Sequence, residues 1–193
     1  MTLPNKLTVL RILLAPVFLV LLILEFPHHY LIALAVFGAA SLTDLFDGKI
    51  ARRTGQITNL GKFLDPLADK MLTTAAFLGF MVCGIGGLAP MMWVNFIVLT
   101  REFLVTSIRY MAASSGKVVA ANIYGKIKTV SQMVAILMAL TFEYVLSLPF
   151  GLEGTGWATA MRVLYVVAIW FSTLMTVVSG AVYAWQNREF LKN

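Results

Sequence analysis

Charged side chains are scarce in this chain. They make up 12% of its 193 residues, whereas a soluble globular domain carries about 25%. Hydrophobic residues make up 60%, and the mean hydropathy is +0.85. This composition excludes an ordinary soluble domain and indicates a membrane protein. The length predicts one compact domain over residues 1–193.

Cysteine is nearly absent, since Cys83 is the only one and no internal disulfide can form. The formal charge of +6 would suggest nucleic acid in a soluble protein, but in a membrane protein it reflects cytoplasmic loops. We therefore expect no nucleic-acid partner. The apolar run 12–24 is interpreted as the start of the chain's membrane helices and not as a cleaved signal peptide, because the apolar character continues along the chain.

Long apolar runs dominate what is present. Each is near the length of about 20 residues that a membrane-spanning helix needs, and Gly and Pro mark most of the breaks between them. The sequence predicts an all-α polytopic bundle of six transmembrane helices with a short N-terminal interfacial segment. The predicted spans are 7–26, 31–50, 66–84, 88–112, 127–148 and 158–185.

The basic residues predict how these spans cross the membrane. If the gaps alternate sides, all but one of the 15 Lys and Arg residues fall on one side, and the exception is Arg162. Because cytoplasmic loops are rich in Lys and Arg, we expect both termini to be cytoplasmic. The acids inside spans fall at the same cytoplasmic ends, while the outer half shows no matching polar set.

Two pairs of carboxylates stand out among those acids. Asp44 and Asp47 are three residues apart, and Asp65 and Asp69 are four apart, so each pair shares one helix face. An acid inside a span costs roughly 2.5–3.5 kcal/mol, and clustered like charges add repulsion. Something positive must therefore compensate.

One interpretation is a solvated ionic collar, in which the acids pair with nearby bases: Lys49, Arg52, Arg53, Lys62 and Lys70. It does not explain the small residues along the acidic stripe. Gly48 lies about 40° and Ala51 about 20° from Asp44 on a helical wheel. The alternative is a metal site beside a bare backbone strip, and carboxylates without His or Cys favour two Mg²⁺ or Mn²⁺ ions.

The spacing of these residues is that of a known signature: Asp44-x2-Asp47-Gly48-x2-Ala51-Arg52-x8-Gly61-x3-Asp65-x3-Asp69. The chain therefore resembles the CDP-alcohol phosphotransferase family. The resemblance implies a membrane enzyme, often dimeric, that displaces CMP from a CDP-linked lipid with an alcohol. It implies that the four aspartates bind two metal ions, that Asp69 is the general base, and that the CDP-lipid is held by Gly48, Ala51, Arg52 and Gly61.

A second basic group bears on the acceptor alcohol: Arg101, Arg109, Lys126 and Lys128. Positive-inside anchoring is one explanation, but Arg101 and Arg109 lie well within an apolar helix, two turns apart. We expect these four residues to bind the phosphate of an acceptor. Glu102 either orients one arginine or balances charge.

The segments "LPNKLTVLR", "GKFLDPLADK" and "GKIKT" resemble the bacterial phosphatidylglycerophosphate synthase branch of that family. The resemblance implies CDP-diacylglycerol as donor and sn-glycerol 3-phosphate as acceptor. It also implies a homodimer embedded in the lipid of a bacterial inner membrane. In the opening segment, Asn5 is expected to cap a helix at the membrane surface. The alternative is that Asn5 and Thr8 close one wall of the nucleotide pocket.

Other functions remain to be compared. The same reaction could use inositol phosphate, serine or phosphatidylglycerol as acceptor. Inositol phosphate would bring a phosphate to the basic group, whereas serine or a second phosphatidylglycerol would leave that group without one. A divalent-cation transporter would also carry acids within spans, but it predicts acids near the bilayer midplane with access from both sides. A purely structural membrane protein would have no use for paired acids beside Gly48 and Ala51.

Overall fold

The computed structural model describes residues 3–54, 59–114 and 123–191. Side chains within these ranges are described except at positions 3, 4, 44–54, 59–63, 65, 66, 69, 114, 190 and 191. The described part is all-helical and has this element order: α1 (Leu3–Ile23), α2 (His29–Thr54), α3 (Asn59–Val82), α4 (Leu88–Ser114), α5 (Ile123–Ser147), α6 (Gly156–Gln186) and the short 3-10 helix η1 (Arg188–Leu191).

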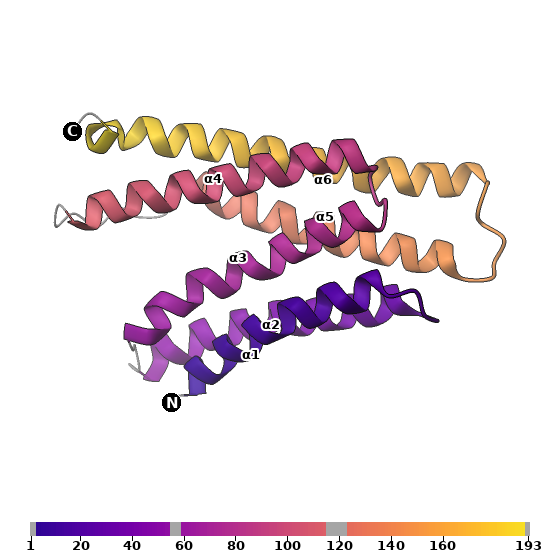
Figure 1. Cartoon of the computed structure of the whole chain (residues 1–193), viewed down its shortest axis with the longest axis horizontal. Coiled ribbons are helices and arrows are strands. Elements are labelled where there is room, and N and C mark those ends of the chain that lie inside the picture. Colours follow the sequence, from indigo (N-terminus) through magenta and orange to yellow (C-terminus); the bar gives the residue numbers. More distant parts are fainter. Residues whose placement is uncertain (1–2, 55–58, 115–122, 192–193) are drawn as a thin grey trace.

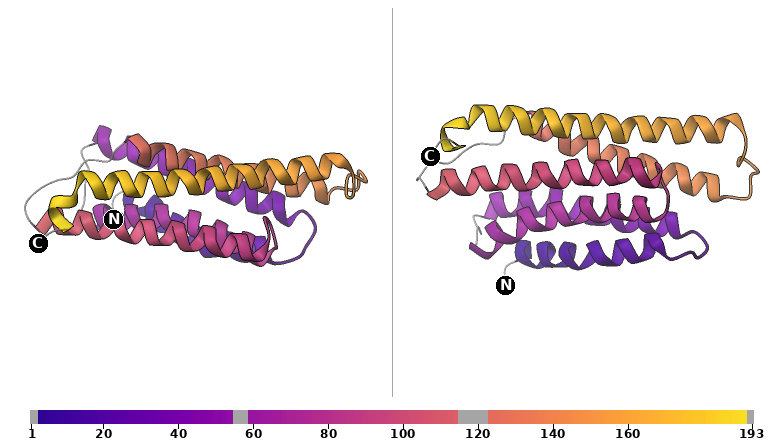
Figure 2. Two further views of the ribbon diagram at one scale, coloured as in Figure 1. Left: turned by 90° about the horizontal axis from the view of Figure 1, so that it is seen from above. Right: turned by 45° about the horizontal axis from the view of Figure 1, so that its top comes forward.

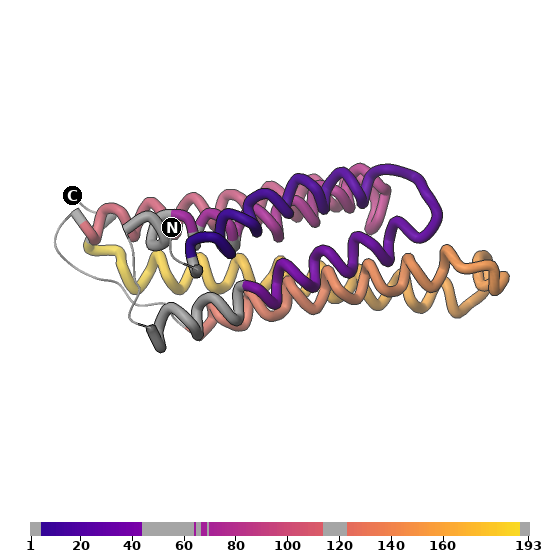
Figure 3. Tube along the Cα trace, turned by 90° about the horizontal axis from the view of Figure 1, so that it is seen from below, coloured from indigo at the N-terminus to yellow at the C-terminus, as the bar shows by residue number. Residues whose placement is uncertain are grey.

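The six long helices run up and down in one bundle (Figure 1). The chain termini and the ends of α2 and α4 lie at one end, and the links after α1, α3 and α5 lie at the other (Figures 1 and 2). Helix α1 packs against α2 and α3, and α5 packs against α6. Helix α2 leaves α1 and continues beside α5, which connects the two halves of the bundle (Figure 3).

The predicted spans correspond in sequence to these six long helices. The length and hydropathy of the described helices do not by themselves establish six membrane crossings. Among the described residues, α1, α4, α5 and α6 contain lengths long and apolar enough to cross a membrane. Within the described side chains, helices α2 and α3 contribute shorter apolar lengths, His29–Thr43 and Lys70–Val82. The protein is thus a membrane protein with several long apolar helices.

The N-terminus differs from the prediction. Helix α1 begins at Leu3, so Asn5 lies inside its first turn and is not a cap, and no separate interfacial segment precedes the helix in the described residues. Asn5, Thr8 and Arg11 are buried. Thr8 and Arg11 continue the buried face of Ala15, Phe18 and Leu22 at alternating spacings of three and four, and Asn5 extends this face into the first turn.

A few contacts fix how the helices of the core lie. Phe18 of α1 packs on Phe37 of α2, with ring centroids 5.6 Å apart. The buried Asn95 of α4 donates hydrogen bonds to the carbonyl oxygen of Phe77 in α3 at 3.1 Å and to that of Met91 at 2.9 Å. Because a buried amide needs partners, these bonds fix α4 against α3.

Candidate functional site

The four aspartates of the motif lie on two helices, α2 and α3. The end of α2 and the start of α3, which carry them, lie at the same end of the bundle. Asp44 and Asp47 belong to the last part of α2, and Asp65 and Asp69 to the first part of α3. Figure 1 shows these helix parts at the end that holds the termini. The side chains of the predicted metal and CDP-lipid residues lie outside the described ones: Asp44, Asp47, Gly48, Ala51, Arg52, Gly61, Asp65 and Asp69.

A metal centre is therefore not tested by the described side chains. Among them, no group of three or more His, Cys, Asp or Glu could hold a metal ion. The helix positions fit the donor set that Mg²⁺ and Mn²⁺ prefer, which consists of oxygen ligands. Spacings of three and four residues put each aspartate pair on one helix face, so the metal assignment stays a prediction about these four positions.

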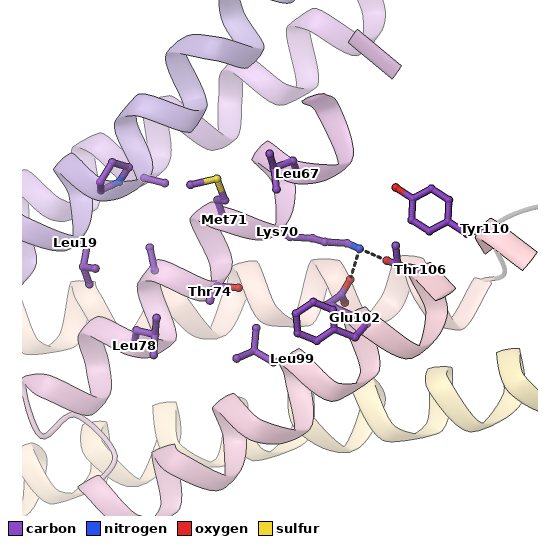
Figure 4. A pocket seen from close by; sticks show the side chains of 14 residues that line it. Leu19, Leu67, Lys70, Met71, Thr74, Leu78, Leu99, Glu102, Thr106 and Tyr110 are labelled. Atoms are coloured by element: carbon purple, nitrogen blue, oxygen red, sulfur yellow. Dashed lines mark hydrogen bonds and ion pairs between the residues drawn. The ribbon is translucent and has the colours of Figure 1, made fainter. Parts of the chain in front are cut away.

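Glu102 of α4 is the centre of a cation cluster that the structure does describe. Its Oε1 accepts a hydrogen bond from Arg101 Nη1 at 3.0 Å and one from Lys128 Nζ at 2.5 Å. Its Oε2 lies 3.5 Å from Lys70 Nζ, and Lys70 also donates to Thr106 (Figure 4). Three cations from α3, α4 and α5 thus share one carboxylate.

The cluster is shielded and carries excess positive charge. The side chains of Lys128, Glu102 and Arg101 are only 8%, 12% and 13% exposed, and that of Lys70 is 34% exposed. Three positive charges and one negative charge leave a formal charge of +2. In a partly buried site such charge attracts anions strongly, and Arg and Lys are the usual side chains that bind phosphate.

Sequence reasoning identified only part of this cluster. It grouped Arg101 and Lys128, which the structure brings together, but it named Lys70 only in the alternative of an ionic collar and left the role of Glu102 open. A lone acid within an apolar helix was the available signal, because such an acid needs cationic partners from neighbouring helices.

The other two predicted phosphate-binding residues lie elsewhere along the helices. Arg109 is exposed, and its guanidinium carbon lies 5.8 Å from the ring centroid of Tyr183 in α6. Lys126 is exposed and lines a shallow groove that also includes Phe171 of α6. Their role in binding a phosphate stays a prediction.

An apolar cavity of about 580 Å³ adjoins the cation cluster. It lies between α1, α3 and α4, and Lys70, Glu102 and Thr106 form its polar edge (Figure 4). The remaining lining is mostly aliphatic and includes Leu19 and Leu78. The cavity is thus apolar over most of its lining, with one cation and one carboxylate, Lys70 and Glu102, at its polar edge.

Polar residues also gather at the opposite end of the bundle, where the sequence predicts no set that matches the acids of the motif. The Tyr165 hydroxyl donates to Glu143 Oε1 at 2.6 Å. Arg162 lies 3.8 Å from Glu143 and donates to Glu153 at 2.7 Å. These residues line a cavity of about 610 Å³ with Tyr30 of α2. Glu143 lies in α5 and Arg162 and Tyr165 lie in α6, so the packing of these two helices brings them together.

That outer set gives little support to a cation path. Both of its carboxylates, Glu143 and Glu153, lie within 4 Å of the same arginine, Arg162. A cation entering this cavity would meet a positive charge beside each acid, which opposes binding.

Comparison with known proteins identifies a family and several relatives with similar sequences. The family model for CDP-alcohol phosphatidyltransferase matches residues 1–178, which confirms the resemblance expected from the motif. The chain is 39% identical to the CDP-diacylglycerol–glycerol-3-phosphate 3-phosphatidyltransferase of Bacillus subtilis (strain 168), over 98% of this chain and 97% of that protein. A probable phosphatidylglycerophosphate synthase of Mycobacterium tuberculosis (strain ATCC 25618 / H37Rv) is 38% identical, over 94% of this chain and 79% of that protein.

A CDP-diacylglycerol–glycerol-3-phosphate 3-phosphatidyltransferase of Pseudomonas fluorescens is 34% identical, over 88% of this chain and 91% of that protein. The similarity thus extends over nearly the whole sequence in several bacteria. This chain belongs to the CDP-alcohol phosphatidyltransferase family.

Proposed function

We propose that this chain is a phosphatidyltransferase of phospholipid biosynthesis. It transfers the phosphatidyl group of CDP-diacylglycerol to sn-glycerol 3-phosphate and releases CMP. The observation that carries the choice of acceptor is the cluster of Lys70, Arg101 and Lys128 around Glu102, because its excess positive charge suits a phosphorylated acceptor. Relatives whose printed names state this activity support the proposal.

The reaction exchanges one phosphorus–oxygen bond for another. The primary hydroxyl oxygen of glycerol 3-phosphate forms a bond to the phosphorus that carries diacylglycerol, and the bond from that phosphorus to CMP breaks. Asp69 takes the hydroxyl proton as general base. Arg52 binds the diphosphate of the donor and stabilises the charge on departing CMP.

Asp44, Asp47, Asp65 and Asp69 would hold two Mg²⁺ or Mn²⁺ ions. When bound, the ions supply charge neutralisation at the diphosphate. Gly48 and Ala51 leave the helix backbone bare where the donor lies against it, and Gly61 permits close approach.

The acceptor is held through its phosphate. Arg101 and Lys128 bind it with Lys70, and Arg109 and Lys126 extend the positive surface toward the end of the bundle where the termini lie. Serine or phosphatidylglycerol would bring no phosphate monoester to this site, whereas inositol phosphate would. The apolar cavity beside Lys70 takes an acyl chain of the donor lipid.

In the membrane, all six long helices cross the bilayer, with the short apolar parts of α2 and α3 completed by their motif-bearing ends. The active site and both termini face the cytoplasm of a bacterial inner membrane, since the basic residues other than Arg162 gather toward that end. The protein acts as one domain over residues 1–193 and as a homodimer, as expected from the resemblance.

The direct test is CMP release by purified protein with CDP-diacylglycerol, glycerol 3-phosphate and Mn²⁺, with Asp65→Asn as the inactive control. We expect release that depends on both the acceptor and the metal. Release with inositol phosphate, serine or phosphatidylglycerol, and none with glycerol 3-phosphate, would reassign the acceptor. Metal flux into proteoliposomes without any CMP release would instead favour a transporter.

A further inference from the structure

Two consecutive residues of α6 hold the side chain of Arg101. The first is Ser179, whose Oγ accepts a hydrogen bond from Arg101 Nε at 3.2 Å. Ser179 is fully buried, and its hydroxyl donates its own proton to the carbonyl oxygen of Thr176 at 3.1 Å. The hydroxyl is thereby oriented with its oxygen toward the guanidinium, so it acts as a fixed acceptor.

The second residue is Gly180, which leaves the space that the arginine stem occupies. A Cβ at this position would lie 2.9 Å from Arg101 Cγ and 3.8 Å from Arg101 Cβ. The Cγ atom is close to the backbone, so it can move away only if the whole side chain changes rotamer. Any residue larger than glycine at position 180 would therefore redirect the guanidinium.

The direction of this side chain matters because of what lies at its far end. Arg101 Nη1 reaches Glu102 Oε1 at 3.0 Å, and the same oxygen is bound by Lys128. A change of rotamer at Arg101 would remove one of the three cations from the cluster and leave Glu102 with fewer donors.

We propose that Ser179 and Gly180 are positioning residues of the acceptor site. They fix Arg101 so that its guanidinium meets Glu102 and Lys128 where the acceptor phosphate binds; this inference rests on the proposed function. Helix α6 thereby takes part in acceptor binding without supplying a charge at that point. The design follows a general rule, since a binding group is effective when neighbouring residues lock its rotamer.

Close packing of helices is the competing explanation, because small residues let membrane helices approach each other. Two observations favour positioning. The side chain that a Cβ at 180 would meet, among the described residues, is that of a charged residue, Arg101. The neighbouring Ser179 binds the same arginine, which helix packing does not require.

The test measures CMP release while each substrate is varied with the other saturating. The variants are Gly180→Ala and Ser179→Ala, and the control is Gly38→Ala in α2, where a Cβ meets nothing within 4 Å. We expect the KM for glycerol 3-phosphate to rise about tenfold in Gly180→Ala and about threefold in Ser179→Ala, since a charged hydrogen bond is lost or displaced. The KM for CDP-diacylglycerol and all constants of Gly38→Ala should stay within about twofold of wild type.

A double-mutant cycle identifies the route of the effect. Adding Gly180→Ala to Arg101→Ala should raise the KM for glycerol 3-phosphate no further, because both changes act through the same side chain. An additive effect would overturn the proposal, as would an equal rise in both KM values. If Gly180→Ala does not fold, Ser179→Ala decides in the same way.

The outcomes separate this inference from the proposed function. If the wild type releases CMP with glycerol 3-phosphate but Gly180→Ala and Ser179→Ala keep its KM, positioning by α6 is wrong and the function stands. If the wild type releases no CMP with glycerol 3-phosphate, the proposed function is wrong and the positioning role falls with it.

Discussion

Replacing Glu102 with glutamine should destabilise the protein strongly, because this carboxylate is the common partner of three cations. The substitution keeps the size of the side chain and removes only its charge. Lys70, Arg101 and Lys128 would then face one another with a formal charge of +3 instead of +2. Their side chains are at most about one-third exposed, so water screens the repulsion only in part.

The size of the effect follows from the contacts. At an effective dielectric constant of about 20, a unit charge pair at the 3.0 Å separation of Arg101 and Glu102 attracts with about 5.5 kcal/mol before desolvation is counted. Desolvation offsets much of that attraction, and removal of one partner from a buried ion pair typically costs about 3–5 kcal/mol. For a chain of this size that loss corresponds to a fall on the order of 10 °C in melting temperature.

The assay is thermal unfolding of the purified protein in detergent, followed by intrinsic fluorescence. Glu153→Gln is the matched control, because its carboxylate also binds an arginine, at 2.7 Å, but is 68% exposed. An exposed pair contributes at most about 1 kcal/mol, so the control should shift by less than about 4 °C. If Glu102→Gln melts no lower than Glu153→Gln, the buried cluster is not what stabilises this region.

An added anion gives a second readout of the same variant. Glycerol 3-phosphate should raise the melting temperature of Glu102→Gln by more than it raises that of the wild type. A ligand that binds only the folded state stabilises it according to its affinity, and the variant site has one more net positive charge. Equal shifts in the two proteins would show that the ligand binds away from this cluster.

Three further outcomes are expected. Asp47→Asn and Asp65→Asn should each abolish CMP release while membrane insertion and the gel-filtration profile stay normal; normal rates in both variants would refute the metal centre. Arg109→Ala should chiefly raise the KM for glycerol 3-phosphate, by about threefold to tenfold, and an unchanged KM would remove this residue from the acceptor site. Gly79→Ala should lower the melting temperature, because a Cβ there would lie 2.5 Å from Leu22 Cδ2 between α3 and α1, and such overpacking costs about 1–3 kcal/mol; unchanged melting would contradict this reading of the α1–α3 contact.

The helices were largely predictable from the sequence, because apolar runs and Gly or Pro breaks coincide with them. The predicted span 88–112 corresponds to α4, Leu88–Ser114, and 127–148 to α5, Ile123–Ser147. The largest difference is at α3, which begins at Asn59 and not at 66. Hydropathy locates the apolar length, whereas a helix continues wherever its backbone hydrogen bonds can, including through charged residues.

Spacing along one helix predicts that Asp44 and Asp47 share a face, and this stays a prediction because their side chains lie outside the described ones. Contacts between different helices could not be predicted in this way. The ion pair between Lys70 and Glu102 depends on how α3 and α4 are rotated against each other. The residue pattern of one helix does not give that rotation. Gly180 carries no chemical signal of its own, because its importance comes from the space it leaves for another helix.

The even number of long helices has a practical consequence for locating this protein in cells. Both chain ends lie at the same end of the bundle (Figure 1), so the proposed topology predicts that a fluorescent protein joined to either terminus reports one and the same compartment. The same topology predicts that a reporter inserted in the link 148–155 between α5 and α6 reports the opposite compartment. Three fusions therefore determine the sidedness of the enzyme without purification.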